Sequence, residues 1–157
     1  MKIHALAALA LLASPAALAA EINVSYDPEF AEDLADEYGE REGAYLTAAI
    51  EKDISQALKK AGVDVARIDV IILDAKPTQP TFKQLSDRPG LDYILSKGIG
   101  GMKLSATMYD ADGSPAGDLT YDWFETSIRD SGLATWSDAK RTSDRFARKI
   151  AKQLKGA

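Results

Sequence analysis

Hydrophobic and polar residues alternate between positions 98 and 126 in a way that predicts a β-hairpin. On the first predicted strand, 102–110, one face is expected to carry apolar side chains and the other polar ones. The apolar positions are Met102, Leu104, Ala106 and Met108, and the polar ones are Lys103, Ser105, Thr107 and Tyr109. Asp112-Gly113 separates this run from a second one at 116–126, and glycine readily adopts the positive φ of a tight hairpin turn.

Three stretches have the three-to-four-residue spacing of apolar side chains that predicts an amphipathic helix. The longest, 44–61, is followed by Gly62 as a helix C-cap. A second, 29–42, is crowded with acidic residues, and its helix is expected to end at Gly39. The third opens with Thr135-Trp-Ser-Asp138, which is close to a capping box, and has one apolar and one basic face. The apolar face is expected to carry Trp136, Ala139, Ser143, Phe146, Ala147, Ile150 and Leu154.

Two further runs predict strands at 21–26 and 68–74. The first alternates between polar and apolar residues, whereas the second is almost continuously apolar and predicts a central strand covered on both sides or nearly so. The order of elements is then β-α-β-β-β-α, with an extra short helix near the start. Because three strands follow a single crossover, we predict an α+β fold, a mostly antiparallel sheet with its helices packed on one face.

The connection 76–97 is unusually long for a compact domain and contains three of the six prolines. Thr81 and Gln84 have the spacing of a capping box and predict a brief helix. A connection of this length is often functional. Alternatively, it wraps over the surface of the domain. The apolar anchors of such a wrap would be Phe82, Leu85, Leu91 and Tyr93.

Residues 1–20 have the layout of a secretory signal peptide. Lys2 precedes an apolar run over 5–13, the pair Ser14-Pro15 and the small residues Ala17-Leu18-Ala19. The run is too short for a membrane anchor, since a spanning helix needs about 20 apolar residues. We therefore expect a single α+β domain at 21–157, located in the periplasm or secreted, with no stable insertion into a membrane.

Composition narrows the chemistry of this domain. The chain has no cysteine, and its only histidine, His4, lies in the predicted signal peptide. An exported chain would lack the residue types of Ser-His-Asp and Cys-His catalysis and of nearly every zinc or copper site. Without Lys2 it would carry 24 acidic and 18 basic residues, a balance that argues against nucleic acid as a partner.

No cofactor motif is recognisable. The glycine cluster at 98–101 precedes a predicted strand rather than a helix, and no Lys-Ser/Thr pair follows it in the register of a phosphate-binding loop.

We assign no catalytic, cofactor-binding or metal-binding residue, and two alternative functions stay open. The first is a hydrolase that uses two carboxylates, with Asp110, Asp122 and Glu125 as candidates.

The second alternative is weak calcium binding by the predicted hairpin turn. Its acidic and hydroxyl side chains imitate the opening of a helix–loop–helix calcium loop. These side chains are Asp110, Asp112, Ser114 and Asp118. Pro115 stands in place of the invariant glycine of such loops, and Tyr121 in place of their bidentate glutamate.

Three short motifs carry a resemblance. They are Lys76-Pro-Thr-Gln-Pro-Thr81, Gly100-Gly101 and Trp136-x-Asp138-Ala139. Together with the predicted order of elements, they resemble small periplasmic proteins and lipoproteins of proteobacteria that are grouped as domains of unknown function. The resemblance covers most of 21–157 and implies an exported α+β module with no established enzymatic role. Lipidated members of these groups carry a cysteine that this chain lacks.

The sequence as a whole favours a non-enzymatic module that binds an envelope protein or a small ligand. Binding would use the open face of the sheet or the 76–97 connection. The candidate interaction residues are Phe82, Tyr93, Tyr109 and Phe124. The oligomeric state and the identity of the partner stay open at this stage.

Overall fold

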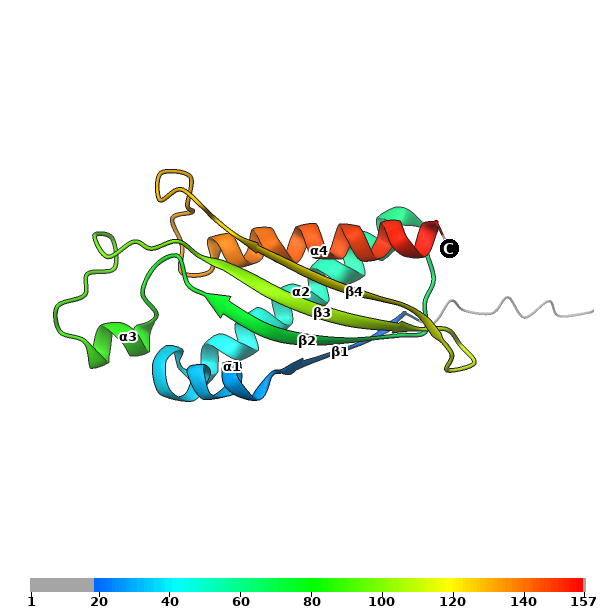
Figure 1. The fold of residues 1–157 in the computed structure, drawn as a ribbon, viewed down its shortest axis with the longest axis horizontal. Helices are drawn as coiled ribbons and strands as arrows, with labels where there is room; N and C mark the ends of the chain where they lie inside the picture. Colours follow the sequence, from blue (N-terminus) through cyan, green and yellow to red (C-terminus); the bar gives the residue numbers. More distant parts are fainter. Residues whose placement is uncertain (1–18, 157) are drawn as a thin grey trace, which may run out of the picture.

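A four-stranded sheet backed by two long helices forms the centre of the protein in a computed structural model that describes residues 19–156 (Figure 1). The strands are β1 (Glu21–Tyr26), β2 (Arg67–Lys76), β3 (Gly101–Tyr109) and β4 (Pro115–Phe124). The helices are α1 (Pro28–Asp33), α2 (Glu40–Ala61), α3 (Phe82–Asp87) and α4 (Ser137–Lys155), and a π-helical turn, η1 (Leu34–Tyr38), joins α1 to α2.

The strands lie in the order β1-β2-β3-β4. The β1–β2 pair is parallel because α2 crosses over between these strands, and the β2–β3 and β3–β4 pairs are antiparallel. Both long helices pack on the same face of the sheet (Figure 1). The predicted α+β fold, with a mostly antiparallel sheet and helices on one face, is therefore confirmed.

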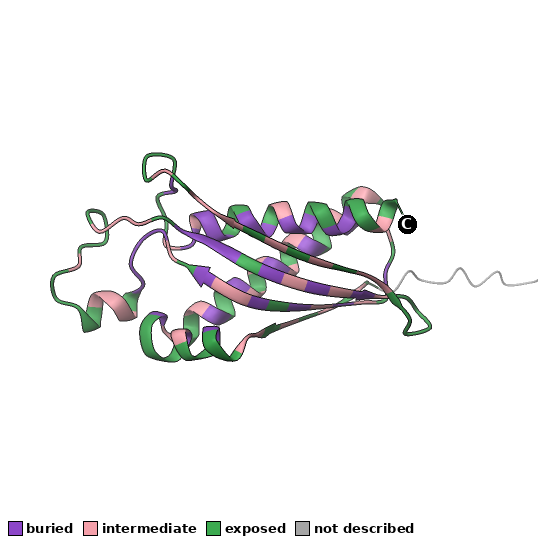
Figure 2. Ribbon diagram, in the orientation of Figure 1, coloured by how far each residue is buried: buried purple, intermediate pink, exposed green. Residues whose placement is uncertain are grey.

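The hydrophobic core lies between this face of the sheet and the helices α2 and α4. Buried and less buried positions alternate along β2 and β3, and the buried sides of both helices face the sheet (Figure 2). The largest fully buried side chains are Phe30, Leu46, Ile50, Ile54, Ile68, Val70, Ile72, Met102, Leu104, Met108, Phe146 and Ile150. The face of β3 that the alternating pattern predicts to be buried is thus the buried one.

Helix boundaries follow the glycines named in the sequence. Gly39, with φ of 100°, ends η1, and α2 begins directly after it, four residues before the predicted start at position 44. Gly62 ends α2 in the left-handed conformation, with φ of 65°, and its backbone N–H bonds to the last turn. Residues 29–38 form α1 and η1 rather than one regular helix.

The prediction that the second strand is covered on both sides is wrong. Ile71, in the middle of β2, is 41% exposed on the face of the sheet that points away from α2 and α4. We call this the outer face. It stays open because both long helices pack on the opposite face and the connection after β2 leaves past the end of the sheet (Figure 1).

The connection between β2 and β3 projects beyond the sheet instead of wrapping over it (Figure 1). The capping box at Thr81 and Gln84 is confirmed, and it begins α3. Of the four predicted apolar anchors, Phe82 and Tyr93 are exposed, whereas Leu85 and Leu91 are half-buried. The stretch 78–81 is buried, and it bonds to the Thr135 carbonyl through its backbone and to Asp138, in the first turn of α4, through the Thr78 hydroxyl.

No helix among residues 19–156 is long and apolar enough to cross a membrane. The predicted signal peptide lies outside the described residues apart from Ala19 and Ala20, so it stays a prediction.

Candidate functional site

A buried carboxylate, Asp138, ties together the loops at one end of the sheet. Its Oδ2 accepts hydrogen bonds from Thr78 Oγ1 at 2.9 Å and from the Gly100 backbone N–H at 3.3 Å. Its Oδ1 accepts from the Gly132 backbone N–H and from Arg141 Nη1, both at 3.0 Å. A fully buried carboxylate needs such partners, because removing it from water without them is costly.

This arrangement differs from the predicted capping box at the start of α4. Trp136 is the N-cap residue and makes no side-chain cap, while the Asp138 side chain points inward. A backbone bond of 2.6 Å from Thr78 N–H to the Thr135 carbonyl adds to the junction. Thr78, Gly100 and Asp138 each belong to one of the three motifs named in the sequence, and the structure brings those motifs together.

We call the end of the molecule organised by Asp138 the loop end. It comprises residues 77–100, residues 125–136 and the first turns of α2 and α4. Hydrogen bonds join its two loops: Lys97 Nζ donates to the Ser131 carbonyl at 2.6 Å, and the hydroxyls of Tyr93 and Thr135 are 3.3 Å apart. The two loops are therefore joined to each other beyond the end of the sheet (Figure 1).

Exposed large hydrophobic side chains concentrate at the loop end. Of the nine that are well exposed among residues 19–156, eight lie there, and the ninth is Ile71 on the outer face. The eight are Tyr45, Phe82, Tyr93, Ile94, Leu95, Ile99, Ile128 and Leu133. Single exposed apolar side chains are ordinary, but their concentration at one end of the molecule is typical of an interaction site there.

Ile94 and Leu95, two neighbouring and highly exposed aliphatic residues, belong to a turn that is held by its own hydrogen bonds. Asp92 Oδ1 accepts from the backbone N–H groups of Ile94 and Leu95, both at 2.8 Å, and Ser96 closes the turn by bonding to Asp92 through its hydroxyl and its N–H. The bonds from Leu95 and Ile94 lower the pKa of the Asp92 carboxyl. Ile94 and Leu95 are consequently held outward at 74% and 85% exposure.

An aromatic notch of about 250 Å³ opens beside α3. Its side chains come from the starts of α2 and α3 and from both loops. They include Tyr45, Phe82, Tyr93 and Trp136. Trp136 Nε1 donates to Glu42 Oε2 at 2.6 Å, and its ring lies edge-on to Tyr38 with centroids 5.8 Å apart. Burial, followed by the charge of Asp33, raises the pKa of Tyr38 to about 12.

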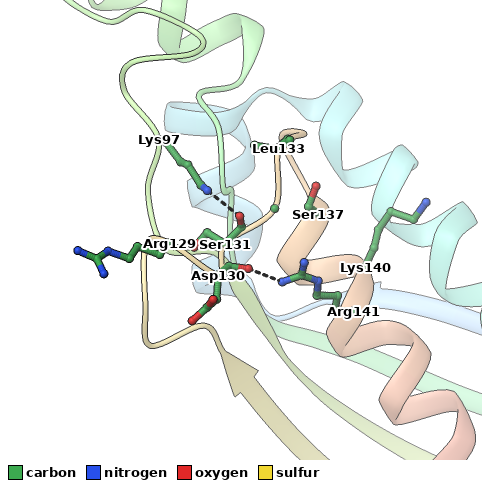
Figure 3. Close-up of a pocket in the computed structure, with 9 residues that line it drawn as sticks. Lys97, Arg129, Asp130, Ser131, Leu133, Ser137, Lys140 and Arg141 are labelled. Carbon is green, nitrogen blue, oxygen red and sulfur yellow. Dashed lines mark hydrogen bonds between the residues drawn. The ribbon is translucent and has the colours of Figure 1, made fainter.

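A second, basic cavity of about 710 Å³ lies between the two loops and the start of α4 (Figure 3). Four cationic side chains line it: Lys97, Arg129, Lys140 and Arg141. Arg141 donates to the Asp130 carbonyl at 2.8 Å and to Asp138, whereas Arg129 extends away from the protein (Figure 3). The exposed Leu133 borders the same cavity.

Comparison with protein-family models and with curated proteins gave no match. The function of the loop end therefore has to follow from its own geometry and chemistry.

The four candidate interaction residues do not form one surface. Phe82 and Tyr93 meet at the aromatic notch of the loop end. Phe124 and Tyr109 lie on β4 and β3, at opposite ends of the hairpin and roughly 25 Å apart along the strand. A cation lies over each ring. Lys76 Nζ is 5.8 Å from the centre of the Phe124 ring, and the Arg67 guanidinium is 4.1 Å from the centre of the Tyr109 ring.

The outer face is mainly polar, and its side chains bond to one another across the strands. Thr107 Oγ1 donates to Asp118 Oδ1 at 2.7 Å, and Asn23 Nδ2 donates to Asp69 Oδ1 at 3.1 Å. Cross-strand pairs of this kind are typical of the solvated face of a sheet that packs its other face on helices. The outer face is therefore a weaker candidate for docking than the loop end.

The three carboxylates of the hydrolase alternative do not share a cleft. Asp110 belongs to the hairpin turn, and Asp122 lies on the outer face in register with Lys103. Glu125 Oε2 is on the helix side, 3.7 Å from Arg141 Nη1. A carboxylate pair must face across about 5–9 Å to hydrolyse a glycosidic bond, and these residues are arranged otherwise.

The hairpin turn uses its own carboxylates for local bonds. Asp112 Oδ1 accepts from the Ser114 hydroxyl at 2.6 Å and from the Ser114 N–H at 2.9 Å, and Asp118 bonds to Thr107. In the part of the chain that the structure describes, no group of three or more acidic or histidine side chains is placed to hold a metal ion. The geometry gives the calcium alternative no support.

The sequence patterns predicted neither the exposed aliphatic side chains at the loop end nor its basic cavity. Ile94, Leu95 and Leu133 stand in segments without helical or strand periodicity, so the pattern assigned them to no face. The available signal was the position of bulky aliphatic residues within polar, glycine-containing loops.

An acidic side chain outside the loop end gives a pH prediction. Burial raises the pKa of Asp74, more than the nearby Lys76 lowers it, in a cavity of about 470 Å³ beside α1. A carboxyl whose pKa is raised on folding stabilises the fold only while it is protonated, and this contribution is lost as the pH rises through the folded pKa. Asp74→Asn should therefore raise the Tm at pH 7, and the gain should vanish below about pH 4.

Thermal unfolding followed by circular dichroism across pH 3 to 8 would measure this effect. Asp64→Asn is the matched control, because Asp64 is exposed after the end of α2 and should leave the Tm unchanged. A lower Tm for Asp74→Asn at pH 7 would show that the attraction of Lys76 exceeds the cost of burial.

Proposed function

We propose that the protein is a non-enzymatic binding module of the cell envelope that docks on its partner through the loop end. The observation that carries this proposal is the gathering of eight of the nine well-exposed large hydrophobic side chains of residues 19–156 on that surface. A folded protein gains free energy when such side chains leave water, by roughly 25 cal/mol per Å² of apolar surface.

The rigidity of the loop end supports a binding role. Asp138 fixes the two loops to the body of the protein, and Asp92 fixes the turn that carries Ile94 and Leu95. Ordering a flexible loop on binding costs conformational entropy, and a surface that is already ordered avoids much of that cost. The loop end should therefore lose little conformational entropy when it binds a partner.

Placement in the envelope rests on the predicted signal peptide at 1–20 and on the resemblance to periplasmic proteins and lipoproteins. A non-enzymatic role rests on the residue types of the chain from position 21 onward, which include neither histidine nor cysteine. The separation of Asp110, Asp122 and Glu125 leaves a carboxylate hydrolase with less support than a binding module.

Site-specific photo-crosslinking in the producing cells would test the proposal. Benzoylphenylalanine in place of Leu95 should form an adduct with a partner protein or with a lipid after irradiation, detected by mass spectrometry, because Leu95 is at the centre of the proposed contact. The same residue in place of Ile71, on the outer face, should give none. The two positions are matched as exposed aliphatic residues on rigid backbone.

Adducts of equal strength at both positions, or at position 71 alone, would contradict docking by the loop end. Absence of any adduct at position 95, with the variant exported and folded, would also contradict it. Thermal unfolding of the purified variants would establish that they are folded.

A further inference from the structure

We infer that the partner of the loop end is the surface of a bilayer that contains anionic lipids. This inference rests on the proposed function and names the partner of the same surface. The contact is made by the cations of the basic cavity and by the exposed aliphatic side chains of the two loops that border it, which together we call the loop corner. It consists of Ile94, Leu95, Lys97, Ile128, Arg129, Leu133, Lys140 and Arg141.

The apolar part of the loop corner has the shape expected for insertion among lipid headgroups. Leu95 and Leu133, at 85% and 81% exposure, stand on two loops that Lys97 joins through its bond to the Ser131 carbonyl. These loops project from the end of the molecule (Figure 1). Bulky aliphatic side chains on projecting tips can enter the boundary between headgroups and acyl chains without any change in the fold.

The cationic part borders Leu133 in space and begins at Lys97, two residues after Leu95 in the chain. Lys97, Arg129 and Lys140 come from three different segments and line one cavity together with Leu133 (Figure 3). Within residues 19–156, neither Arg129 nor Lys140 forms an ion pair or a side-chain hydrogen bond. Both are consequently free to contact lipid phosphates, as basic residues beside an apolar insertion surface do.

Positive charge exceeds negative charge at the loop corner. Among residues 19–156, two exposed carboxylates belong to this region: Asp130 lines the same cavity, and Asp92 holds the turn that carries Ile94 and Leu95. Asp138 is buried and paired with Arg141. The remaining cations, Lys97, Arg129 and Lys140, outnumber the two exposed carboxylates. The acidic run 29–42 belongs to α1, η1 and the start of α2, which lie on the other side of the sheet end from residues 127–133 (Figure 1).

A lipid surface fits the loop corner better than a protein does. Protein interfaces depend on Trp, Tyr and Arg side chains that fill pockets of the partner, and Leu is under-represented among their energetic centres. The loop corner instead carries aliphatic side chains on convex tips, and the aromatic side chains of the loop end gather separately at the notch. A protein partner seated on the notch is the competing outcome of the test.

Co-sedimentation of the exported chain with sucrose-loaded vesicles would test the inference. Vesicles of phosphatidylglycerol and phosphatidylcholine in equal parts should bind it, and vesicles of phosphatidylcholine alone should bind it much less. Raising the salt concentration should weaken the binding to the anionic vesicles, because salt screens the charges of lipids and protein.

Variants should distinguish the contribution of the aliphatic side chains to vesicle binding from that of the cationic side chains. Leu95→Ser should lower the partition coefficient roughly tenfold, and Leu133→Ser similarly, since each removes a large aliphatic side chain from the lipid. Arg129→Gln should lower it about fivefold on anionic vesicles and leave the binding to phosphatidylcholine unchanged. Ile71→Ser, at the exposed aliphatic position on the outer face, is the control and should bind like the parent chain.

Three results would overturn the inference: no binding to anionic vesicles, equal binding to both vesicle types, or binding that Leu95→Ser and Leu133→Ser leave unchanged. If vesicle binding fails while crosslinking at position 95 yields a protein adduct, the partner is a protein. In that case the lipid inference falls and the proposed docking surface stands. If both experiments fail, both proposals fall.

Discussion

Asp138→Ala should lower the free energy of unfolding by about 4 kcal/mol, as expected when one partner of a buried charged network is removed. The substitution leaves the Thr78 hydroxyl and the backbone N–H groups of Gly100 and Gly132 without their acceptor inside the protein. Arg141 loses an ion pair of 3.0 Å at the same time. Urea unfolding followed by tryptophan fluorescence and circular dichroism would measure the change.

Asp144→Ala is the matched control on the same helix. Asp144 pairs with Arg148 at 2.6 Å, but both side chains are exposed, and such a pair contributes only about 0.5 kcal/mol. An effect of Asp138→Ala no larger than that of the control would show that the buried carboxylate does not hold the loops.

Gly100→Ala should cost roughly 2 to 3 kcal/mol, because the added methyl group has no space at the junction of the loops. A Cβ at this position would lie 2.5 Å from Thr78 Oγ1 and 2.9 Å from the Lys76 carbonyl oxygen. The carbonyl is part of the backbone at the end of β2, so the strain is relieved only by moving the strand end or the start of β3. The same urea unfolding experiment would detect it.

Gly90→Ala provides the comparison for Gly100→Ala. Nothing lies within 4 Å of a Cβ at Gly90, which belongs to the same connection between β2 and β3. This substitution should be neutral or stabilise the protein by up to about 1 kcal/mol, since alanine restricts the unfolded chain. Equal losses for the two variants would contradict a tight contact at Gly100.

The two stability predictions bear on the proposed function because both residues hold the loop end in place. Asp138 connects the 77–100 connection with the segment before α4, and these two segments carry most of the exposed apolar side chains. A variant such as Asp138→Ala should therefore bind vesicles more weakly even though Asp138 itself is buried and touches no lipid. Leu95→Ser should show the reverse, weaker binding with unchanged stability.

The elements that sequence analysis placed well are those whose spacing repeats. Alternation along 102–110 identified the buried face of β3, and the apolar stripe ending at Gly62 identified α2. The capping box at Thr81 located α3 because it is a local hydrogen-bond pattern. Each of these features depends on residues a few positions apart.

The errors concern features that depend on distant parts of the chain. The apolar run in β2 gave no sign that its outer face would stay open, because that depends on where α2 and α4 pack. Thr135 and Asp138 had the spacing of a helix cap, but Asp138 turned inward, where its partners are 60 residues away at Thr78 and 38 residues away at Gly100.

The sequence by itself determined the period of each strand and helix, their order, and the residue types available for chemistry. These follow from local spacing and composition, which act wherever the chain is placed in space. Only the tertiary structure decided that three separate motifs converge on Asp138 and that Leu95 and Leu133 project together beside Lys97. The reason is that a surface formed by two loops more than 30 residues apart exists only after the sheet and its helices have fixed where those loops begin and end.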